Sequence, residues 1–512
     1  MTTGSYIMTI DMGTSAAKAT ILSSDFERIA TASRDQDTIR TRPGWAEQDP
    51  KAWWRIVTSA TQEVIKKSSI DPRKIAVIGV TAQMHGSVPV DKDGNSLMNC
   101  IIWAEVRARA EAAELNEKIS HVPSLKGMII WAYYTAAKIM WIKRHRPDVY
   151  KRIYKVLLPK DYIRFKLTRR FATDVTDAGG SQMFDPERQQ WNRPLLDVME
   201  IHESILPEIR KTEDLAGEVT EEAARETGIP EGTPVIVGGG DGSFIRVGLG
   251  EIDVGDAYVY MGTAPAAYVC IDHQVKDAER VYCMPLLNQP GKWLIGGFNG
   301  PTVASMFWYE NQLGYLEAAA AEKEGISVFQ MMDREAEKIS PGSDGLIMLP
   351  HFQGERTPLY TTDAKATIFG LRLGHTRQHI IRAILESVGY AARSVTEIAE
   401  KKYGASFSTV RLYGGGAKSK IWRQIMADIF GKPVQIPKET EVGSLGLAYT
   451  AAIGIGWYRD LGEIGIRPNP IVETVQPNEH SSRVYQSMFE IYQKLDQSML
   501  EIYGMARGID LA

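Results

Sequence analysis

Val235-Ile-Val-Gly-Gly-Gly-Asp-Gly-Ser243 joins a short apolar run to three glycines and an aspartate. The apolar run predicts a buried strand, and the glycines permit backbone conformations that bring the chain close to a bulky neighbour. Asp241 would then lie on a loop at the end of a strand, partly shielded from water. A carboxylate in this position can serve as a general base, and it can equally be an ordinary turn residue.

The length and the charge of the chain limit what it can be. Its 512 residues exceed what a single hydrophobic core usually supports, so we expect two domains, residues 1–246 and 247–512. The 59 basic and 63 acidic residues give a net charge of −4. This balance argues against a large cationic surface, and we expect neither a nucleic acid nor a membrane as a partner.

The cysteines and the N-terminal sequence indicate the cellular compartment. Cys100, Cys270 and Cys283 lack the spacing of metal ligands and favour free thiols in a reducing environment. The sequence shows no signal-peptide pattern, and no apolar run reaches the roughly 18 residues of a membrane helix. We therefore expect a cytoplasmic protein.

Two segments share a hairpin layout. Residues 6–22 have the pattern of a strand, a turn at Gly13-Thr14 and a returning strand, and residues 257–271 repeat this order around Gly262-Thr263. A duplicated hairpin early in each half predicts two related domains. The similarity between the copies is slight, which leaves a chance match as the alternative.

Apolar periodicity and breaks at Gly and Pro predict the other main elements. The helix expected at 444–452 is rich in small residues, so it can pack closely against a sheet or a ligand. We expect strands at 75–80, 88–90 and 410–413, and helices at 51–67, 104–118, 135–145, 376–403, 444–452 and 481–506.

The two Gly-Thr turns are candidates for phosphate binding, because each could present backbone N–H groups and a hydroxyl to phosphate oxygens. Asp11, just before the first turn, could hold Mg²⁺, and Lys18 could balance the charge on a terminal phosphate. A single Gly-Thr turn is common in hairpins. Two of them, together with the Gly-Gly-Gly-Asp loop, favour nucleotide binding.

A third glycine cluster, Gly414-Gly-Gly416, lies between a predicted strand and a helix that contains Ser419 in its first turn. Such a turn lets an adenine or a ribose lie against the backbone near a helix N-terminus. The chain contains neither G-x-x-x-x-G-K-[ST] nor G-x-G-x-x-G, and neither H-E-x-x-H nor G-x-S-x-G. These absences argue against Walker-type ATPases, nicotinamide dehydrogenases, zinc proteases and serine hydrolases.

A group of polar and aromatic residues follows the strand predicted at 75–80. Gln83, Met84 and His85 lie in the segment Thr81–Gly86 at its carboxyl end, and Trp103 and Glu105 come about twenty residues later. Amide, imidazole and carboxylate groups beside an indole face suit a polyhydroxylated substrate. A buried structural histidine and a packing tryptophan are the alternatives for His85 and Trp103.

The chain resembles the FGGY carbohydrate kinases along nearly its whole length. Two long signatures carry this resemblance: Tyr133-Tyr-Thr-Ala-Ala-Lys-Ile-Met-Trp-Ile-Lys-Arg-His145, and Ala366-Thr-Ile-Phe-Gly-Leu371 followed after seven residues by His379-Ile-Ile-Arg-Ala-Ile-Leu-Glu386. Three shorter motifs stand in the family's order: Ile10-Asp-Met-Gly-Thr14, Tyr260-Met-Gly-Thr263 and Gly414-Gly-Gly-Ala-Lys-Ser-Lys-Ile-Trp-Arg-Gln424.

The resemblance implies an α/β fold of two actin-like ATPase (ribonuclease H-like) domains, with a catalytic cleft between them that binds ATP, Mg²⁺ and a sugar. Asp241 would be the catalytic base, and Asp11 and Asp241 would hold Mg²⁺. The implied sugar-binding residues are Gln83, Met84, His85, Trp103, Glu105, Asp241 and Gly242. The implied ATP-binding residues are Gly13, Thr14, Lys18, Gly262, Thr263, Gly300, Gly415, Gly416, Ala417 and Ser419.

Within the family the chain is most similar to xylulokinases. Four segments are typical of that subgroup: Gly44-Trp-Ala-Glu-Gln-Asp-Pro50, Thr81-Ala-Gln-Met-His-Gly86, Val156-Leu-Leu-Pro-Lys-Asp-Tyr162 and Ala172-Thr-Asp-Val-Thr-Asp-Ala178. Four residues depart from its pattern. Gly242 stands where relatives usually carry a sugar-contacting Asn, Ala104-Glu105 replaces Asn-Asp, and Ala264 replaces Ser.

We therefore expect an ATP-dependent kinase that converts D-xylulose to D-xylulose 5-phosphate, and the resemblance also implies a homodimer. Another ketose, a polyol or a sugar acid is the alternative substrate. A non-catalytic sugar-binding regulator, an actin-like ATPase and an NAD-linked polyol dehydrogenase are the alternatives from other classes. Intact Asp11 and Asp241, the Gln-Met-His loop and the missing dinucleotide fingerprint argue against these three.

Overall fold

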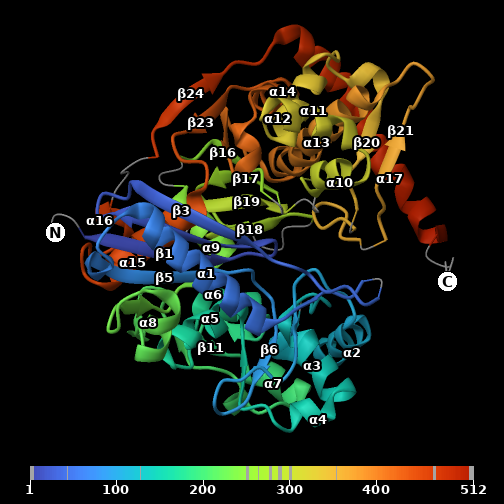
Figure 1. Cartoon of the computed structure of the whole chain (residues 1–512). Helices are drawn as coiled ribbons and strands as arrows, with labels where there is room; N and C mark the ends of the chain where they lie inside the picture. Colours follow the sequence, from blue (N-terminus) through green and yellow to red (C-terminus); the bar gives the residue numbers. More distant parts are fainter. Residues whose placement is uncertain are drawn as a thin grey trace. The chain divides into compact units, whose positions relative to one another are not determined.

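The computed structural model describes residues 5–42, 44–126, 128–249, 253–262, 265–275, 280–285, 291–298, 303–352, 354–361, 363–464 and 469–506. The chain forms two compact units (Figure 1). The first comprises Met1–Leu249 and Gly443–Gly465, and the second comprises Gly250–Val442 and Ile466–Ala512.

The first unit is built on a seven-stranded mixed sheet with the strand order β13-β14-β5-β1-β2-β3, and β15 also pairs with β5. β1, β2 and β3 form an antiparallel meander, while β1 and β14 both run parallel to β5. The strands are β1 (Tyr6–Met12), β2 (Ala16–Ser23), β3 (Arg28–Asp35), β5 (Ile75–Ala82), β13 (Leu215–Glu218), β14 (Pro234–Ile236) and β15 (Gly239–Gly240).

The register of this sheet gathers three chain segments at one edge. Asp11 is opposite Lys18 in β2 and beside Thr81 in β5, and Gly240 pairs with Ala82. The carboxyl ends of parallel strands lie at the same edge of a sheet, where α/β proteins place their ligands. The ends of β1, β5 and β15 therefore meet at that edge.

The second unit repeats this arrangement in a sheet of order β18-β19-β17-β16-β22-β23-β24. β16, β17 and β19 are antiparallel neighbours, and β16, β22 and β23 are parallel. The predicted hairpin at 257–271 is confirmed. The strands are β16 (Asp256–Tyr260), β17 (Ala266–Ile271), β18 (Tyr282–Pro285), β19 (Trp293–Phe298), β22 (Thr409–Tyr413), β23 (Val434–Pro437) and β24 (Ile471–Val475).

Helices and short two-stranded ladders surround the first sheet. α1 packs against β2 and β3, and Asp49 caps its N-terminus by accepting a hydrogen bond from the Lys51 amide. The helices are α1 (Pro50–Ser68), α2 (Arg109–Ser120), α3 (Thr135–His145), α4 (Pro147–Tyr150), α5 (Pro159–Thr168), α6 (Val175–Gly180), α7 (Arg193–Met199), α8 (Glu221–Thr227) and α9 (Asp241–Gly248). The short strands are β4 (Glu47–Gln48), β6 (Val88–Val90), β7 (Cys100–Ile101), β8 (Lys155–Leu157), β9 (Thr173–Asp174), β10 (Phe184–Asp185), β11 (Gln190–Trp191) and β12 (Ile209–Arg210).

The predicted helix at 104–118 was wrong at its start, because α2 begins only at Arg109. Glu105 accepts hydrogen bonds from the backbone amides of Ala46, at 2.5 Å, and Arg107, at 2.6 Å. A side chain that captures nearby backbone amides holds its segment in a non-helical conformation.

In the second unit the predicted helix at 376–403 is confirmed as α13, which is buried along most of its length and contacts β17, β19, α12 and α14. The helices here are α10 (Ala304–Gln312), α11 (Tyr315–Glu324), α12 (Val328–Glu337), α13 (Arg377–Tyr403), α14 (Lys420–Phe430) and α17 (Glu479–Ala506), and β20 (Ile347–Leu349) pairs with β21 (Thr367–Phe369). Among the described helices of both units, none combines the length and apolar composition that a membrane crossing requires.

α15 (Val442–Gly454) and α16 (Leu461–Ile464) belong to the first unit although they come late in the sequence. The two units therefore do not correspond to one division of the chain after residue 246. Figure 1 shows both helices, in late-sequence colours, beside the blue strands of the first sheet. Small residues allow this approach: an added Cβ at Gly446 would lie 2.1 Å from the backbone oxygen of Phe244. The packed α15 shares an apolar cluster with Val77 and Phe244.

Gly446→Ala tests this close contact. The added methyl group would overlap the α9 backbone, and overpacking of this kind typically costs about 1–3 kcal/mol. Gly443→Ala on the same helix is the matched control, because its Cβ would meet only Ile245 Cγ1 at 3.9 Å. We expect urea unfolding to show a loss of stability for Gly446→Ala alone. Equal stability of the two variants would contradict the packing described.

Candidate active site

Asp241 is the first residue of α9 and follows β15 directly. It is half-buried, and its Oδ1 accepts a hydrogen bond from the amide of Gly242 at 2.7 Å. Burial raises the pKa of Asp241 to about 7 and the negative charge of Asp11 adds to this rise, while the Gly242 amide and Arg246 oppose it. A carboxylate with a pKa near neutrality is suited to accept a proton at physiological pH.

Asp11 supplies the second carboxylate at this edge of the sheet. It is half-buried in β1 and lies opposite Lys18. β1 and β15 both pair with the end of β5, with Asp11 beside Thr81 and Gly240 beside Ala82, and the charge of Asp11 helps to raise the pKa of Asp241. Oxygen donors of this kind fit Mg²⁺, which binds proteins through one or two carboxylates and takes its other ligands from water and phosphates.

The turn after Asp11 is held by its own backbone and by side chains. The amide of Gly13 donates to the carbonyl of Ala16 at 3.0 Å. The hydroxyl of Thr14 donates to Gln83 at 3.2 Å and accepts from the indole of Trp103 at 2.6 Å. Three predicted residues from different segments therefore meet at one hydroxyl group.

Gln48 was not among the predicted site residues, although it completes this network. Its amide nitrogen donates to the Thr14 carbonyl at 2.8 Å, and its oxygen accepts from Gln83 at 2.7 Å and from Trp53 at 3.0 Å. It lies in the segment Gly44–Pro50, which was recognised only as a subgroup motif. The sequence signal for Gln48 was its position, as an uncharged polar residue just before the helix predicted at 51–67.

Met84 and His85 form a loop against the glycines that precede Asp241. An added Cβ at Gly240 would lie 2.7 Å from the sulfur of Met84. His85 has a positive φ of 65°, and its Nδ1 lies 2.7 Å from the carbonyl oxygen of Gly180. The buried Lys138 of the first family signature donates to the His85 carbonyl at 2.7 Å. The signature therefore supports the loop.

Glu105 is placed differently from the other predicted sugar residues. Its side chain is fully buried, and besides two backbone amides it binds the guanidinium of Arg107 at 2.8 Å. Arg107 in turn stacks on Trp45, 3.8 Å from the ring centroid. This geometry supports a role for Glu105 in holding the loop that carries Trp103.

In the second unit the structure brings two predicted nucleotide segments together. The Gly416 amide donates to the Met261 carbonyl at 3.1 Å, and an added Cβ at Gly414 would lie 2.8 Å from the carbonyl carbon of Met261. Gly262 therefore adjoins this glycine cluster, in which Gly415 is exposed and Ala417 is buried. Ser419 caps α14, accepting from the Trp422 amide at 3.2 Å. The predicted residues Thr263 and Gly300, and the departure at Ala264, lie outside the described residues.

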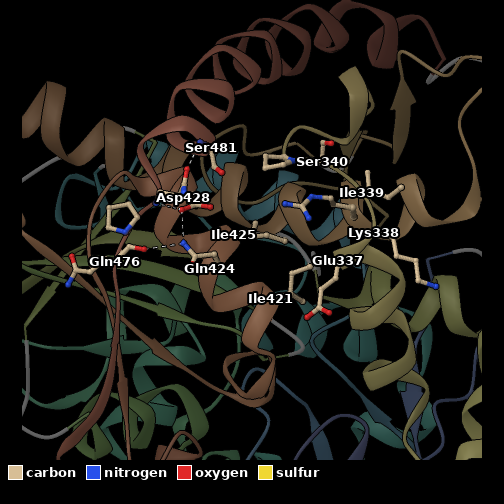
Figure 2. A pocket seen from close by; sticks show the side chains of 14 residues that line it. Glu337, Lys338, Ile339, Ser340, Ile421, Gln424, Ile425, Asp428, Gln476 and Ser481 are labelled. Atoms are coloured by element: carbon tan, nitrogen blue, oxygen red, sulfur yellow. Dashed lines mark hydrogen bonds between the residues drawn. The ribbon is translucent and has the colours of Figure 1, made fainter.

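A pocket of about 630 Å³ lies elsewhere in the second unit (Figure 2). It is lined by one side of α14, by residues 337–341 and by residues 476–481. Gln424 bridges part of its wall, donating to Asp428 at 2.8 Å and to the carbonyl of Gln476 at 3.1 Å. The lining residues that the structure describes include none of the predicted nucleotide or sugar residues.

Comparison with known proteins agrees with this fold and geometry. Residues 6–248 match the N-terminal domain and residues 257–455 the C-terminal domain of the FGGY family of carbohydrate kinases. The chain belongs to this family, and it is a sugar kinase, a phosphotransferase.

The relatives differ in the activity that their names give. The chain is 29% identical to a xylulose kinase of Escherichia coli K12, over 96% of this chain and 99% of the relative, and 27% identical to a gluconokinase of Bacillus subtilis 168, over 99% of both. A solved structure of ligand-bound xylulose kinase from Lactobacillus acidophilus superimposes with a TM-score of 0.82 at 26% identity, covering 98% of this chain and 99% of that one.

The raised pKa of Asp241 predicts a pH-dependent cost to stability. The folded state holds this proton up to about pH 7, whereas an unfolded aspartate, with its ordinary pKa of 3.8, releases it near that pH. The free energy of unfolding therefore falls as the pH rises between these values, by about 1.4 kcal/mol per pKa unit. Asp241→Asn resembles the protonated form and removes this penalty.

We expect Asp241→Asn, without nucleotide or divalent metal, to be more stable than the wild type above pH 7 and equally stable near pH 4. Urea unfolding at several pH values measures the difference. A difference that does not change with pH would contradict the raised pKa.

Proposed function

We propose that this sugar kinase transfers the γ-phosphate of ATP to the primary hydroxyl of D-xylulose, giving D-xylulose 5-phosphate. The observation that carries the proposal is the half-buried Asp241, whose pKa is raised to about 7 beside Asp11 at the edge of the first sheet. The similarity to xylulose kinases over nearly the whole chain supports the choice of sugar.

In the proposed reaction Asp241 accepts the proton of the sugar hydroxyl as its oxygen attacks the γ-phosphorus. A new oxygen–phosphorus bond forms, the bond to the bridging oxygen of ADP breaks, and ADP leaves. Mg²⁺ held by Asp11 and Asp241 would supply positive charge beside the phosphates. Lys18, opposite Asp11, adds a second positive charge at the same edge. Thr14 keeps the phosphate turn in place through Gln83 and Trp103.

The loop of Met84 and His85 is the proposed sugar contact. Met84 lies against the glycines before Asp241, and His85 is anchored at Gly180. Gly242 leaves room beside the base, since an added Cβ there would meet only the sulfur of Met84 at 4.0 Å. The sugar carbon next to the reacting hydroxyl is proposed to occupy this room.

A sugar acid is the second candidate substrate, and Arg246 is the observation that favours it. Arg246 is half-buried one helical turn after Gly242, on the same face of α9, and its charge lowers the pKa of Asp241. A guanidinium beside open space can bind a substrate carboxylate. The similarity to a gluconokinase supports this alternative.

Asp241→Asn tests the base. The variant keeps the shape of the side chain but cannot accept the proton, so we expect kcat to fall by about 100- to 10,000-fold. We expect the variant still to bind the sugar, as measured by calorimetry in the presence of a non-hydrolysable ATP analogue. Coupled ADP release measures turnover, and a variant that keeps near-normal kcat would remove Asp241 from this role.

A panel of sugars decides between the two substrates. ADP release is measured with D-xylulose, other pentuloses, hexuloses, pentitols, tetritols and D-gluconate. The highest kcat/KM is expected for D-xylulose. Turnover of D-gluconate with D-xylulose inert would support the sugar acid instead, and Arg246→Gln should then abolish the gluconate activity through a rise in KM.

A further inference from the structure

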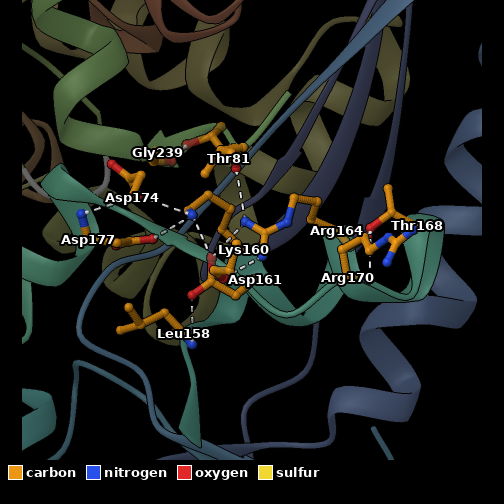
Figure 3. Close-up of polar contacts among 12 residues, drawn as sticks. Thr81, Leu158, Lys160, Asp161, Arg164, Thr168, Arg170, Asp174, Asp177 and Gly239 are labelled. Atoms are coloured by element: carbon orange, nitrogen blue, oxygen red, sulfur yellow. Dashed lines mark hydrogen bonds and ion pairs between the residues drawn. The ribbon is translucent and has the colours of Figure 1, made fainter. Parts of the chain in front are cut away.

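A cluster of charged side chains is buried beside Gly239 (Figure 3). Residues 238–241 comprise Gly238, the short strand β15 and Asp241 at the start of α9, and they are called the catalytic loop below. Lys160 Nζ lies 2.6 Å from Asp161, 3.1 Å from Asp174 and 3.7 Å from Asp177, and Arg164 lies 3.1 Å from Asp161. All five side chains are at most 1% exposed. Buried charges are costly unless they are paired and hydrogen-bonded, so such a cluster holds its elements in a defined arrangement.

Thr176 connects this cluster to the catalytic loop. Its amide and its hydroxyl both donate to Asp174 Oδ2, at 2.7 and 2.5 Å. The same hydroxyl accepts a hydrogen bond at 3.0 Å from the amide of Gly240, the residue before Asp241. A continuous path of ion pair and hydrogen bonds therefore runs from Lys160 through Asp174 and Thr176 to the backbone of the loop.

The glycines of the loop fit closely against their supports. An added Cβ at Gly239 would lie 2.8 Å from the Thr176 hydroxyl, and one at Gly238, where φ is +71°, would lie 1.9 Å from the Val80 carbonyl oxygen. On the other side, the Thr81 hydroxyl donates to the Gly239 carbonyl at 2.7 Å. The loop is thus fixed between β5 and the start of α6.

We infer that Thr176 is a positioning residue, which transmits the rigidity of the buried Lys160–Asp174 pair to Gly240 and so fixes where the Asp241 carboxylate stands. The inference rests on the proposed role of Asp241 as base. Thr176 acts through the Gly240 amide and itself contacts no reacting atom.

The size of the effect follows from the demands of phosphoryl transfer. A base must stand within hydrogen-bond distance of the hydroxyl it deprotonates. A displacement of about 1 Å in such a group costs up to about 100-fold in rate. Losing the Thr176 hydroxyl leaves the buried Gly240 amide without its acceptor, and the loop shifts to find another.

Thr176→Val, which keeps the shape but removes the hydroxyl, is the primary variant, and Thr176→Ser restores the hydroxyl. Thr173→Val is the matched control, because Thr173 is buried in the same segment and its hydroxyl has no hydrogen-bond partner among the described residues. Urea unfolding first establishes that all three variants are folded.

Two measurements then follow. Hydrogen–deuterium exchange of the peptide covering residues 236–244 should accelerate in Thr176→Val, and not in Thr176→Ser or Thr173→Val. The kcat with the best sugar of the panel should fall about 10- to 100-fold in Thr176→Val with KM for ATP unchanged, and Thr176→Ser should recover most of it.

The outcomes separate the inference from the proposed function. Unchanged exchange in Thr176→Val overturns the inference, whatever the activity. Accelerated exchange with unchanged kcat also overturns it, since the loop would then not need this anchor. Near-normal turnover of Asp241→Asn would instead contradict the role of Asp241 as the base. The exchange result would still decide whether Thr176 anchors the loop.

Discussion

The parallel pairing of β5 with β1 on one side, and with β14 and β15 on the other, is the constraint on which the first unit's site depends. It brings Asp11, Gln83 and Asp241 to one edge from three distant parts of the chain. A register shift of one residue would turn the Asp11 side chain to the opposite face of the sheet. The apolar strand β5, buried over most of its length, fixes the register, and the chemistry follows from it.

In the second unit the same strand arrangement brings different groups together. Its meander and parallel strands bring the backbone of Met261 and Gly262 against the backbone of Gly414 and Gly416. Gly414 adopts a φ of +87° with its Cβ position filled by the Met261 carbonyl, which excludes any side chain there. The edge of the first sheet thus carries the carboxylates of Asp11 and Asp241, whereas the second sheet brings together the backbone of glycine-containing segments.

The local features of the fold were accessible from the sequence, and the contacts between distant segments were not. The hairpins around Gly13 and Gly262 and the long helix α13 follow from alternation, turn residues and helical periodicity, all of which act over short stretches. The start of α2 escaped prediction because the Glu105 side chain captures the amide of Ala46, a partner distant in sequence. The return of α15 to the first unit depends on the close contact between Gly446 and Phe244. Hydrophobic periodicity along the sequence does not indicate this contact.

The site shows the same limit. Asp11 and Asp241 were identifiable as carboxylates at strand ends, but the effect of Asp11 on the pKa of Asp241 arises only once β1 and β15 flank β5. Gln48 and Thr176 are uncharged residues in segments that the sequence identified only as subgroup motifs, Gly44–Pro50 and Ala172–Ala178. Their importance comes from hydrogen bonds to Thr14 and Gly240, and these partners become neighbours only in the folded chain.

The return of α15 and α16 to the first unit means that the chain passes between the units three times, near residues 249, 442 and 465. The two halves of the polypeptide are therefore not independent building blocks. A fragment ending after α9 would lack the helix that covers Val77 and Phe244, and would expose that apolar surface to water. Split reporters, domain exchanges and tandem fusions built on this scaffold have to keep residues 443–465 with the N-terminal segment.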